Sequence, residues 1–361
     1  MRLLPPLTPS DGNRTVLLGM SGGTDSSVAA MLLQDAGYKV TGVTFRFFEA
    51  KETEKPPFIE AQELAARLGI EHIVYDARKE FESMIIRYFV DEYMNARTPV
   101  PCVVCNNRLK WPLLLKIAEE RGIFYVSTGH YARIVDHKGL PLIAKGADPD
   151  KDQSFFLWGI SEEIRKRMLL PLGEILKSDA RKIAHEKGFA AVAEKKDSIG
   201  VCFCPNDYRP FLLSRLNGQE IKPGLFTDEK GDIIAKHKGY PFYTIGQRRG
   251  LGINLQQPVY VKEIDKATNR IVLSGLQSLY KQEMRLTDYF FANPEGLESG
   301  REAICKIRYR KQATPAIVKK RDDKYLHVRL LKPLEMVAPG QAAAFYDGDV
   351  VLGGGIIDSA R

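Results

Sequence analysis

The sequence contains no apolar run near the roughly 18 residues that a membrane-spanning helix requires. Its first residues, MRLLPPLTPSDGNR, offer only two adjacent leucines before prolines interrupt them, unlike the apolar core of a secretion signal. Internal repeats and low-complexity tracts are also missing, which excludes coiled-coil, collagen-like and disordered chains. We therefore expect a globular, cytoplasmic protein with no membrane partner.

Cysteine is scarce, with five residues in the whole chain, and this odd count argues against a framework of structural disulfides. Thiol chemistry or metal binding is expected instead. Histidine is also scarce, and most of the six residues lack the spacing of metal ligands, so we expect these to be structural. They are His72, His137, His185, His237 and His327.

The residues that are present describe a large basic protein. A chain of 361 residues is long enough for two or three domains with a sizeable core. Lys and Arg number 53 against 45 Asp and Glu, and the resulting net charge of +8 favours a polyanionic partner such as nucleic acid.

Short β-rich runs alternate with helical stretches from Thr15 to about residue 76. Each helical stretch ends at a glycine, Gly37 or Gly69, and the connections are short. This βαβαβ order predicts a doubly wound parallel sheet with helices on both faces, which binds ligands at the carboxyl ends of its strands. A further buried strand is expected over 123–129.

Two more helices are expected, over 79–96 and over 108–121. Pro99 and Pro101 lie between them, and two prolines so close together favour a loop. Cys105 follows in this loop. Because a helix dipole favours the thiolate of a cysteine just before the helix, we expect Cys105 to be a reactive thiol.

After about Asp207, short alternating runs punctuated by glycine and proline replace the helices. This pattern predicts two small β-rich domains, the last a barrel of about six strands. The expected division is 1–207 for the parallel-sheet domain, 208–280 for a small β-rich central domain and 281–361 for a C-terminal β-barrel.

The segment SGGTDS (21–26) lies directly after a predicted strand and directly before a predicted helix. Its two glycines permit a tight turn with inward-pointing N–H groups, and the helix N-terminus adds about half a positive charge. Together with the hydroxyls of Ser21 and Ser26, these groups predict a phosphate-binding loop. It is neither a Walker A loop, because no Gly-Lys-Ser/Thr follows, nor a dinucleotide fingerprint.

This loop resembles the pyrophosphate loop (PP-loop) of the ATP pyrophosphatase superfamily, whose members adenylate an oxygen and release pyrophosphate. The resemblance implies that the chain binds ATP and that Asp25 helps to position Mg²⁺, a hard cation that prefers oxygen ligands. The implied ATP-binding residues are Gly19, Met20, Ser21, Gly22, Gly23, Thr24, Asp25, Ser26, Phe45 and Gly129.

Further motifs follow in order, and they resemble the bacterial tRNA-specific 2-thiouridylase (MnmA) family over nearly the whole chain. The resemblance implies ATP-dependent replacement of the C2 oxygen of the wobble uridine (position 34) of tRNA by sulfur. The first domain would then be catalytic and the last would contact tRNA. The motifs are Pro101-x-x-x-Cys105-Asn106, Gly129-His130-Tyr131, Lys151-Asp152-Gln153-Ser154, Gly200-x-Cys202-Phe203, TIGQRRGLG from Thr244, and Arg308-Tyr309-Arg310.

Such a reaction has two chemical requirements. The oxygen must become a leaving group, which adenylation achieves, and a sulfur nucleophile must reach the same carbon. The resemblance implies that Cys105 is the nucleophile and that Cys202 carries a persulfide received from a sulfur-donor protein, with a disulfide between them after transfer. Cys204 and Cys305 are expected to be inert buried thiols.

Cys102 departs from the family, which usually has an acidic residue at this position, so the proton-handling role of that acid does not carry over. Cys102, Cys105 and Cys202 could instead supply three thiolates to an iron–sulfur cluster with one open iron site. Two mechanisms therefore stay open: a persulfide relay, which we prefer, and cluster-assisted thiolation. Structural zinc is a third reading, but it lacks a fourth ligand.

Basic residues with interleaved tyrosines occur in all three expected domains, a pattern that suits tRNA phosphates and unstacked bases of the anticodon loop. The resemblance implies that Val100, Pro101 and Cys102 line the target base. The other implied tRNA contacts are His130, Lys151, Asp152, Gln153, Arg308, Tyr309 and Gln341.

Two other functions fit less well. A noncatalytic tRNA-binding protein has no need of Asp25 or Cys105, and both are present. An amidotransferase-like ligase would need an ammonia-producing domain or an amino-acid site, and the cysteine pair argues against it.

Overall fold

The computed structural model describes residues 12–49, 57–195, 200–204, 206–216, 218–309 and 313–361. The chain divides into two compact units, each with its own hydrophobic core. The first comprises Met1–Ile85, Cys102–Ile199 and Asp347–Leu352, and the second comprises Ile86–Pro101, Gly200–Tyr346 and Gly353–Arg361. Within the described ranges, no helix has the length and apolar character needed to cross a membrane.

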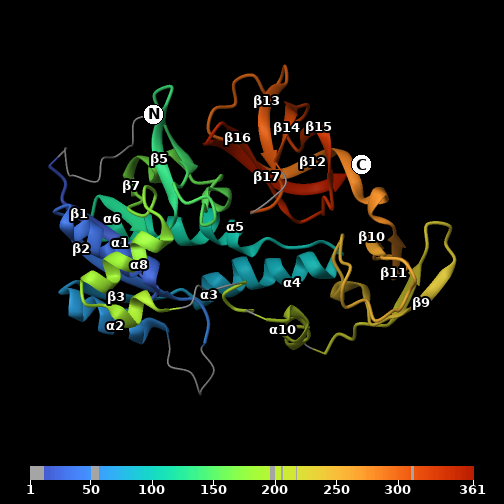
Figure 1. The fold of residues 1–361 in the computed structure, drawn as a ribbon, viewed down its shortest axis with the longest axis horizontal. Helices are drawn as coiled ribbons and strands as arrows, with labels where there is room; N and C mark the ends of the chain where they lie inside the picture. Colours follow the sequence, from blue (N-terminus) through green and yellow to red (C-terminus); the bar gives the residue numbers. More distant parts are fainter. Residues whose placement is uncertain (1–11, 50–56, 196–199, 205, 217, 310–312) are drawn as a thin grey trace. The chain divides into compact units, whose positions relative to one another are not determined.

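A parallel sheet forms the centre of the first unit, with the strand order β3-β2-β1-β4-β7 (Figure 1). Its register sets Gly19, at the end of β1, beside Val43 of β2 and Thr128 of β4, so the carboxyl ends of these strands share one edge. The doubly wound parallel sheet expected from the sequence is confirmed. The strands are β1 (Thr15–Gly19), β2 (Lys39–Arg46), β3 (Glu71–Asp76), β4 (Tyr125–Thr128) and β7 (Met168–Leu169).

Helices cover both faces of this sheet. Val16 and Leu18 of β1 lie in a core formed with the helices of one face. Because side chains alternate along a strand, Leu17 and Gly19 face the other side, where Leu114 of α6 (Trp111–Glu120) approaches Gly19. The helices of the first face are α1 (Thr24–Asp35), α2 (Pro57–Leu68), α8 (Lys177–Glu186) and α9 (Ala190–Ala193).

The helix that carries Cys102 and Cys105 begins at Pro101. It runs without interruption through α5 (Pro101–Cys105), the π-helical segment η2 (Asn106–Lys110) and α6. The expectation of a loop around Cys105, with a helix only from 108, is therefore wrong. Pro101 occupies the first helical position, where its missing N–H has no intrahelical partner and its fixed φ suits the helix.

A second long helix is built in the same way, close to the expected range of 79–96. It consists of α3 (Arg78–Phe81), the π-helical segment η1 (Glu82–Ile86) and α4 (Arg87–Met94). The division between the units falls within this helix, because α4 belongs to the second unit.

An antiparallel hairpin completes the first unit, and a strand from the far end of the sequence borders it. The hairpin strands β5 (Ala132–His137) and β6 (Leu140–Lys145) pair with each other, and Ala144 of β6 pairs with Val350, the first residue of β17 (Val350–Ala360). Lys145 also forms an ion pair with Asp349 at 3.2 Å. The remaining helices of this unit are η3 (Ser154–Phe156) and α7 (Glu162–Arg167).

The second unit contains the small β-rich sheet predicted for the central domain, with the order β10-β11-β8-β9. Phe226 and Ile271 from this sheet share a core with Phe89 of α4 and Leu212 of α10. The sequence pattern does not predict α10. The elements are α10 (Tyr208–Ser214), β8 (Gly224–Thr227), β9 (Ile233–His237), η4 (Tyr240–Phe242), β10 (Tyr260–Asp265), β11 (Arg270–Ser274) and η5 (Leu276–Leu279).

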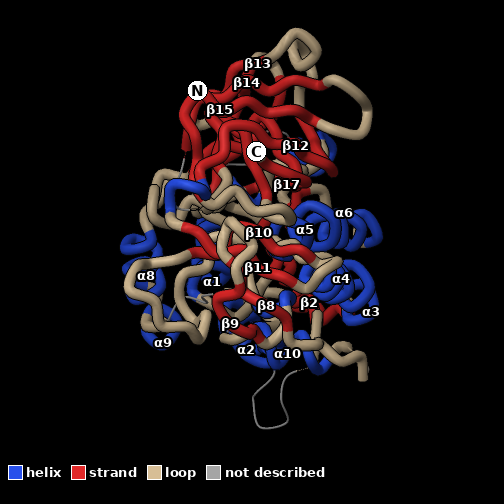
Figure 2. Tube along the Cα trace, turned by 90° about the vertical axis from the view of Figure 1, so that its right-hand side faces the viewer, coloured by secondary structure: helices blue, strands red, loops and turns tan. Residues whose placement is uncertain are grey.

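A barrel follows, with the strand order β12-β15-β14-β13-β16-β17, and it is closed by the pairing of β12 with β17 (Figure 2). Leu286, Val328 and Phe345 are buried within it. The barrel of about six strands expected at the C-terminal end is confirmed. Its first five strands are β12 (Tyr280–Phe291), β13 (Arg301–Lys306), β14 (Ala313–Lys320), β15 (Leu326–Glu335) and β16 (Ala342–Asp347).

Candidate active site

The loop between β1 and α1 has the geometry of an anion-binding turn. Gly22 adopts a φ of +71°, a left-handed conformation that favours glycine, and a Cβ there would lie 3.0 Å from the amide nitrogen of Ala61. Gly23 is the N-cap of α1, and no side chain caps this helix end. The first N–H groups of α1 are therefore available to an anion.

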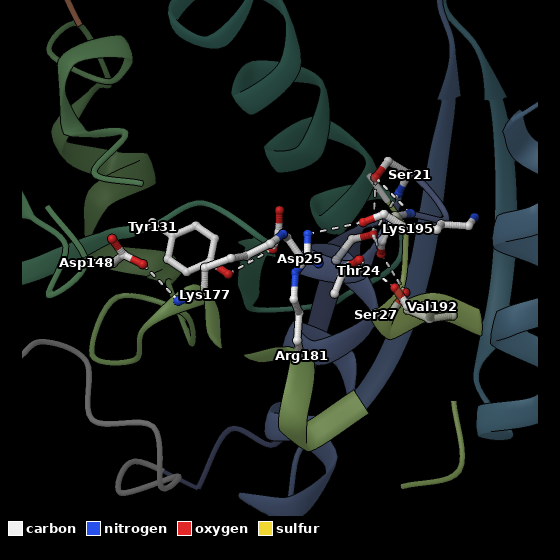
Figure 3. Close-up of polar contacts among 12 residues, drawn as sticks. Ser21, Thr24, Asp25, Ser27, Tyr131, Asp148, Lys177, Arg181, Val192 and Lys195 are labelled. Carbon is white, nitrogen blue, oxygen red and sulfur yellow. Dashed lines mark hydrogen bonds and ion pairs between the residues drawn. The ribbon is translucent and has the colours of Figure 1, made fainter. Parts of the chain in front are cut away.

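Hydroxyl groups fix the shape of this loop (Figure 3). The amide of Ser21 donates to Ser26 Oγ at 3.1 Å, and the Ser26 hydroxyl donates to the Gly23 carbonyl at 3.3 Å. The Thr24 hydroxyl donates to the Val192 carbonyl at 2.6 Å, which ties α1 to α9. Ser21 is exposed, whereas Thr24 is buried, so Ser21 is the better placed of the two to meet a ligand.

Met20 and Phe45 lie where β1 and β2 end. The Met20 amide donates to the Val43 carbonyl at 2.8 Å, and the Thr44 hydroxyl donates to the Met20 carbonyl at 2.8 Å. Phe45 is half-buried, and its ring stacks on Phe47 at a centroid distance of 5.4 Å. An apolar ring therefore borders the edge of the sheet from which the loop starts.

Gly129 follows β4 and packs on the backbone of the loop. A Cβ at Gly129 would lie 2.7 Å from the carbonyl carbon of Asp25 and 2.8 Å from the amide nitrogen of Ser26. Real Cβ atoms essentially never approach so closely. Only glycine fits at this position without moving the loop.

Asp25, in the first turn of α1, contacts two residues that no sequence motif singled out for it. Lys177 Nζ donates to Asp25 Oδ1 at 2.6 Å, and the Tyr131 hydroxyl donates to the same oxygen at 2.9 Å (Figure 3). The amide of Lys177 also donates to Asp148 Oδ2 at 2.9 Å. Because the Lys177 side chain is only 10% exposed, its charge is held firmly beside the loop.

Lys195 is a second cation at the loop. Its Nζ donates to the Gly22 carbonyl and to Glu60 Oε2, both at 2.7 Å. Arg181 of α8 donates to the Lys195 carbonyl at 3.3 Å, so three cationic residues surround the loop (Figure 3). Sequence proximity gives no sign of this, because Lys177 follows Asp25 by 152 residues and Lys195 follows Gly22 by 173.

Cys102 and Cys105 lie near the start of the helix that begins at Pro101. Cys102 is half-buried and Cys105 is buried. Burial raises the pKa of both thiols, while the Lys110 ammonium acts in the opposite direction. The expectation that a helix dipole favours the Cys105 thiolate is therefore wrong. The helix begins before Cys105, and desolvation outweighs the nearby cation.

Lys110 connects the cysteine pair with the end of β4. Its Nζ donates to Asn106 Oδ1 at 3.2 Å, and Asn106 Nδ2 donates to the Cys102 carbonyl at 3.0 Å. Desolvation lowers the pKa of His130 to about 3, and the Lys110 charge acts in the same direction. One ammonium group thus influences Cys102, Cys105 and His130.

With this lowered pKa, His130 is neutral near pH 7. Its Nδ1 lies 2.6 Å from Thr128 Oγ1, and its ring lies 6.0 Å from the ring of Trp111 between centroids. As a tRNA contact, His130 would therefore offer hydrogen bonds and stacking and no positive charge.

Cys202 lies in the second unit, at the tip of a tight turn. Val201 and Cys204 form a bridge in which the Cys204 amide donates to the Val201 carbonyl at 2.9 Å. Cys202 is exposed and Cys204 is buried, while the ring of Phe203 packs edge-on against Phe89 at 5.2 Å. All five cysteines lie in described ranges and none is disulfide-bonded. Asp197, Ser198 and Ile199, which precede this turn, lie outside the described residues.

Two of the residues predicted to contact tRNA at 151–153 form hydrogen bonds to nearby backbone amides. The Asp152 carboxylate, in a residue only 6% exposed, accepts the Ser154 amide at 3.0 Å. Gln153 Oε1 accepts the Tyr131 amide at 3.0 Å. Lys151 is half-buried. Asp152 therefore stabilises its own loop, and Gln153 holds the backbone of Tyr131, whose hydroxyl contacts Asp25.

The second unit brings two other predicted tRNA contacts together. Gln341 Nε2 donates to the carbonyls of Thr98 and Pro99, both at 3.1 Å. Val100 is buried, and its amide donates to the Tyr88 hydroxyl at 3.3 Å. Gln341 therefore fixes the segment that leads into Pro101.

Arg308 and Tyr309 follow β13 of the barrel. Arg308 is exposed, and its guanidinium donates to the Met336 carbonyl at 3.4 Å. Tyr309 is half-buried. Arg310 and Lys311, which belong to the same basic cluster, lie outside the described residues.

Three family models match the chain in succession. They are the tRNA methyl transferase HUP domain over residues 14–206, the tRNA methyl transferase PRC-barrel domain over 210–275 and the aminomethyltransferase beta-barrel domain over 281–357. These descriptions agree with the parallel sheet, the small central sheet and the closed barrel. Fold and loop together define an ATP-utilising protein of the PP-loop class.

Relatives with nearly the same length define the family. The tRNA-specific 2-thiouridylase MnmA 2 of Phocaeicola vulgatus is 58% identical over 348 residues, which cover 96% of this chain and 99% of that protein. MnmA 1 of Bacteroides fragilis is 56% identical over 356 residues, with 96% and 97% covered. MnmA of Cytophaga hutchinsonii is 41% identical over 359 residues, with 96% and 97% covered. The chain belongs to the MnmA family of tRNA-specific 2-thiouridylases.

Proposed function

We propose that this protein is a tRNA-uridine 2-sulfurtransferase, which converts the wobble uridine at position 34 of tRNA to 2-thiouridine. The activity named for its relatives, tRNA-specific 2-thiouridylase, supports this proposal. In the first stage, the C2 oxygen of the base attacks ATP and pyrophosphate leaves. In the second stage, sulfur replaces the adenylated oxygen and AMP leaves. Because its substrate is tRNA, we propose a cytoplasmic location.

The loop after β1 is proposed to bind the phosphates of ATP through residues 19–26, with Gly129 beside it and Phe45 near the base. The free N–H groups of α1 and the exposed Ser21 hydroxyl are suitable donors. Lys177, Lys195 and Arg181 add positive charge, which would stabilise pyrophosphate as it leaves.

Mg²⁺ is proposed to bind together with ATP, and Asp25 fits part of such a site. Its side chain is 38% exposed, and Oδ1 accepts from Lys177 and Tyr131, which orients the carboxylate. Oδ2 would then be the ligand atom, with phosphate and water oxygens completing the coordination. When bound, Mg²⁺ would neutralise charge on the phosphates.

Sulfur is proposed to travel as a persulfide. The exposed Cys202 would accept it from a sulfur-donor protein, and its terminal sulfur would attack C2 as AMP leaves. Cys105 would then attack the Cys202 sulfur and break the S–S bond to the base. The products are 2-thiouridine and a Cys105–Cys202 disulfide.

tRNA binding is proposed to use both units. Val100, Pro101 and Cys102 would line the target base, and His130 and the loop 151–153 would add contacts in the first unit. In the second unit, the exposed Arg308 would meet the phosphate backbone. Tyr309 and Gln341 complete the proposed set. We also propose that the chain has three functional domains, with residues 1–207 catalytic, 208–280 central and 281–361 contacting tRNA.

The observation that carries this proposal is the position of Lys110, whose Nζ donates to Asn106, the residue that in turn donates to the Cys102 carbonyl. The Lys110 charge acts on both thiols of the cysteine pair and on His130. His130 directly follows Gly129, which packs on the ATP loop. The proposed ATP loop, Cys102 and Cys105 therefore belong to one unit, and the persulfide carrier Cys202 belongs to the other.

The test is a thiolation assay with the full chain, a tRNA transcript bearing U34, ATP and enzyme preloaded with persulfide. Mass spectrometry of the nucleosides should show 2-thiouridine, and AMP and pyrophosphate should appear in equal amounts. A transcript with C34 is the control and should give neither thiolation nor excess AMP. ADP as the product, or U34 left unmodified, would contradict the proposal.

Cluster-assisted thiolation by Cys102, Cys105 and Cys202 stays an alternative hypothesis. Cys102 and Cys105 offer two thiols from one helix, whereas Cys202 belongs to the other unit. In the part of the chain that the structure describes, no three His, Cys, Asp or Glu side chains are grouped as metal ligands. One turnover by metal-free, persulfide-loaded enzyme separates the two routes, because only the relay gives product under that condition.

A further inference from the structure

Cys102 and Cys105 form a Cys-x-x-Cys pair on one helix, and Cys102 is the residue that stands where the family usually has an acid. Residues three apart on a helix have Cβ atoms about 5–6 Å apart. Both residues lie in the helix that begins at Pro101, so their side chains occupy neighbouring positions on its surface. Cys102 is the more exposed of the two.

We propose that Cys102 is a resolving thiol, which converts the Cys105–Cys202 disulfide left by thiolation into a Cys102–Cys105 disulfide. This inference rests on the proposed function, because the persulfide relay is what produces the first disulfide. It makes Cys102 a catalytic residue in a step after sulfur transfer.

The exchange balances without an added oxidant. The Cys102 thiolate attacks the Cys105 sulfur, a Cys102–Cys105 bond forms, and the Cys105–Cys202 bond breaks. Cys202 leaves as a thiolate and takes up the proton that Cys102 lost. The exposed Cys202 is then ready for the next persulfide, and a dithiol reductant returns the Cys102–Cys105 pair to two thiols.

The local structure suits this exchange. Burial raises the pKa of Cys102, the attacking thiol, and the Lys110 charge partly offsets this by favouring the thiolate. Cβ atoms of a disulfide lie about 3.5–4.5 Å apart, so closure requires a shift of about 1–2 Å. Cys102 is the second helical residue, and its N–H has no intrahelical acceptor to lose when it moves.

Cys204 is the competing candidate, because it follows Cys202 by two residues. Its thiol is buried, and burial together with the Asp207 carboxylate raises its pKa. No described cation is among the causes of this shift, in contrast to the Lys110 effect at Cys102. Cys204 is buried in the second unit, whereas the more exposed Cys102 lies on the same helix as Cys105, so Cys204 serves as the matched control.

The experiment allows persulfide-loaded full-length enzyme one turnover on U34 tRNA, quenches it with acid and an alkylating reagent, and maps disulfides by mass spectrometry without reduction. Wild type and Cys204→Ser should yield a Cys102–Cys105 disulfide with Cys202 alkylated. Cys102→Ser and Cys102→Asp should lose this disulfide and stop at Cys105–Cys202. Disulfide yields are normalised to the 2-thiouridine formed.

A second arm omits tRNA and ATP and equilibrates the full chain with oxidised glutathione. Cys102–Cys105 should again be the end product. If it does not form in this arm, the inference is overturned whatever happens to thiolation. If 2-thiouridine forms but wild type retains Cys105–Cys202 or gives Cys202–Cys204, the inference fails while the proposed function stands. An enzyme that makes no 2-thiouridine contradicts the proposed function.

Discussion

Gly129 and Asp25 touch backbone to backbone, since a Cβ on Gly129 would lie 2.7 Å from the carbonyl carbon of Asp25. No side chain separates the end of β4 from the loop between β1 and α1 at this point. The conformation of the loop and the position of the strand are therefore coupled, and the residue that couples them has no side chain to adjust.

Gly129→Ala should weaken ATP binding, because the added methyl group displaces the peptide between Asp25 and Ser26. We expect the KM for ATP to rise about tenfold or more, which corresponds to a loss of at least about 1.4 kcal/mol. Pyrophosphate release against ATP concentration measures this. The matched control is Gly275→Ala, because no atom lies within 4 Å of a Cβ there. An unchanged KM in Gly129→Ala would show that the loop is not part of the ATP site.

Lys177→Met should lower the rate of pyrophosphate release by about 10- to 100-fold, the range expected for loss of one hydrogen bond to a charged group. The variant keeps most of the side-chain volume but removes the charge beside Asp25. Lys182→Met is the control on the same helix, because its side chain is 72% exposed. Equal rates in the two variants would contradict a role for Lys177 at the phosphates.

Arg308→Ala should reduce the salt dependence of tRNA binding. If its exposed guanidinium neutralises one phosphate, the slope of log affinity against log salt should decrease by about one. Filter binding between low and moderate salt measures this slope. Arg121→Ala is the control. Arg121 lies at the C-terminal end of α6 and forms an ion pair with Glu71 at 3.0 Å, so we expect it to make no tRNA contact. A slope that is unaffected by Arg308→Ala would assign Arg308 to another role.

His130 should make stability depend on pH below neutrality. Burial lowers its pKa in the folded protein to about 3, well below the usual histidine value of about 6.5. Between these values the unfolded chain binds a proton that the folded chain does not, so stability falls as pH drops from about 6.5 toward 3. The melting temperature of His130→Gln should therefore fall less than that of wild type between pH 7 and pH 5. Parallel pH profiles would contradict this account.

Cys305 should be dispensable for thiolation although it is fully buried in the barrel. Cys305→Ala leaves a small cavity that costs about 1 kcal/mol, whereas Cys305→Ser buries a hydroxyl and costs about 1–3 kcal/mol. Both variants should form 2-thiouridine at the wild-type rate at a temperature well below unfolding. Melting curves and the nucleoside assay together separate stability from activity. A loss of thiolation in a folded variant would contradict the prediction.

The parts of the fold that follow from local rules were predictable. The run SGGTDS between a strand pattern and a helix pattern is typical of an anion-binding turn, and the glycines Gly37 and Gly69 mark where helices end. The barrel strands follow from alternation and turn residues. These features depend on interactions within a few residues.

The parts that failed depend on context. Pro101 reads as a helix breaker in isolation, but at the first helical position it is compatible with the helix. The thiol pKa of Cys105 depends on burial by other elements, which a local dipole argument does not capture. Lys177 and Lys195 reach the loop from residues more than 150 positions later in the chain, so no spacing in the sequence reveals them. Tyr131 belongs to a recognised motif, but the motif does not reveal its hydrogen bond to Asp25.

The strand β17 is the last to be synthesised, and the two units share its residues. Val350 pairs with Ala144 of β6, about 200 residues earlier in the chain. At roughly 5–20 residues per second, translation leaves this edge of β6 unpaired for about 10–40 s. Exposed edges of this kind attract other strands, so the nascent chain carries an aggregation-prone edge until its last strand is made. The first unit, although it is encoded mainly by the first half of the sequence, is therefore completed only when the last strand has been made.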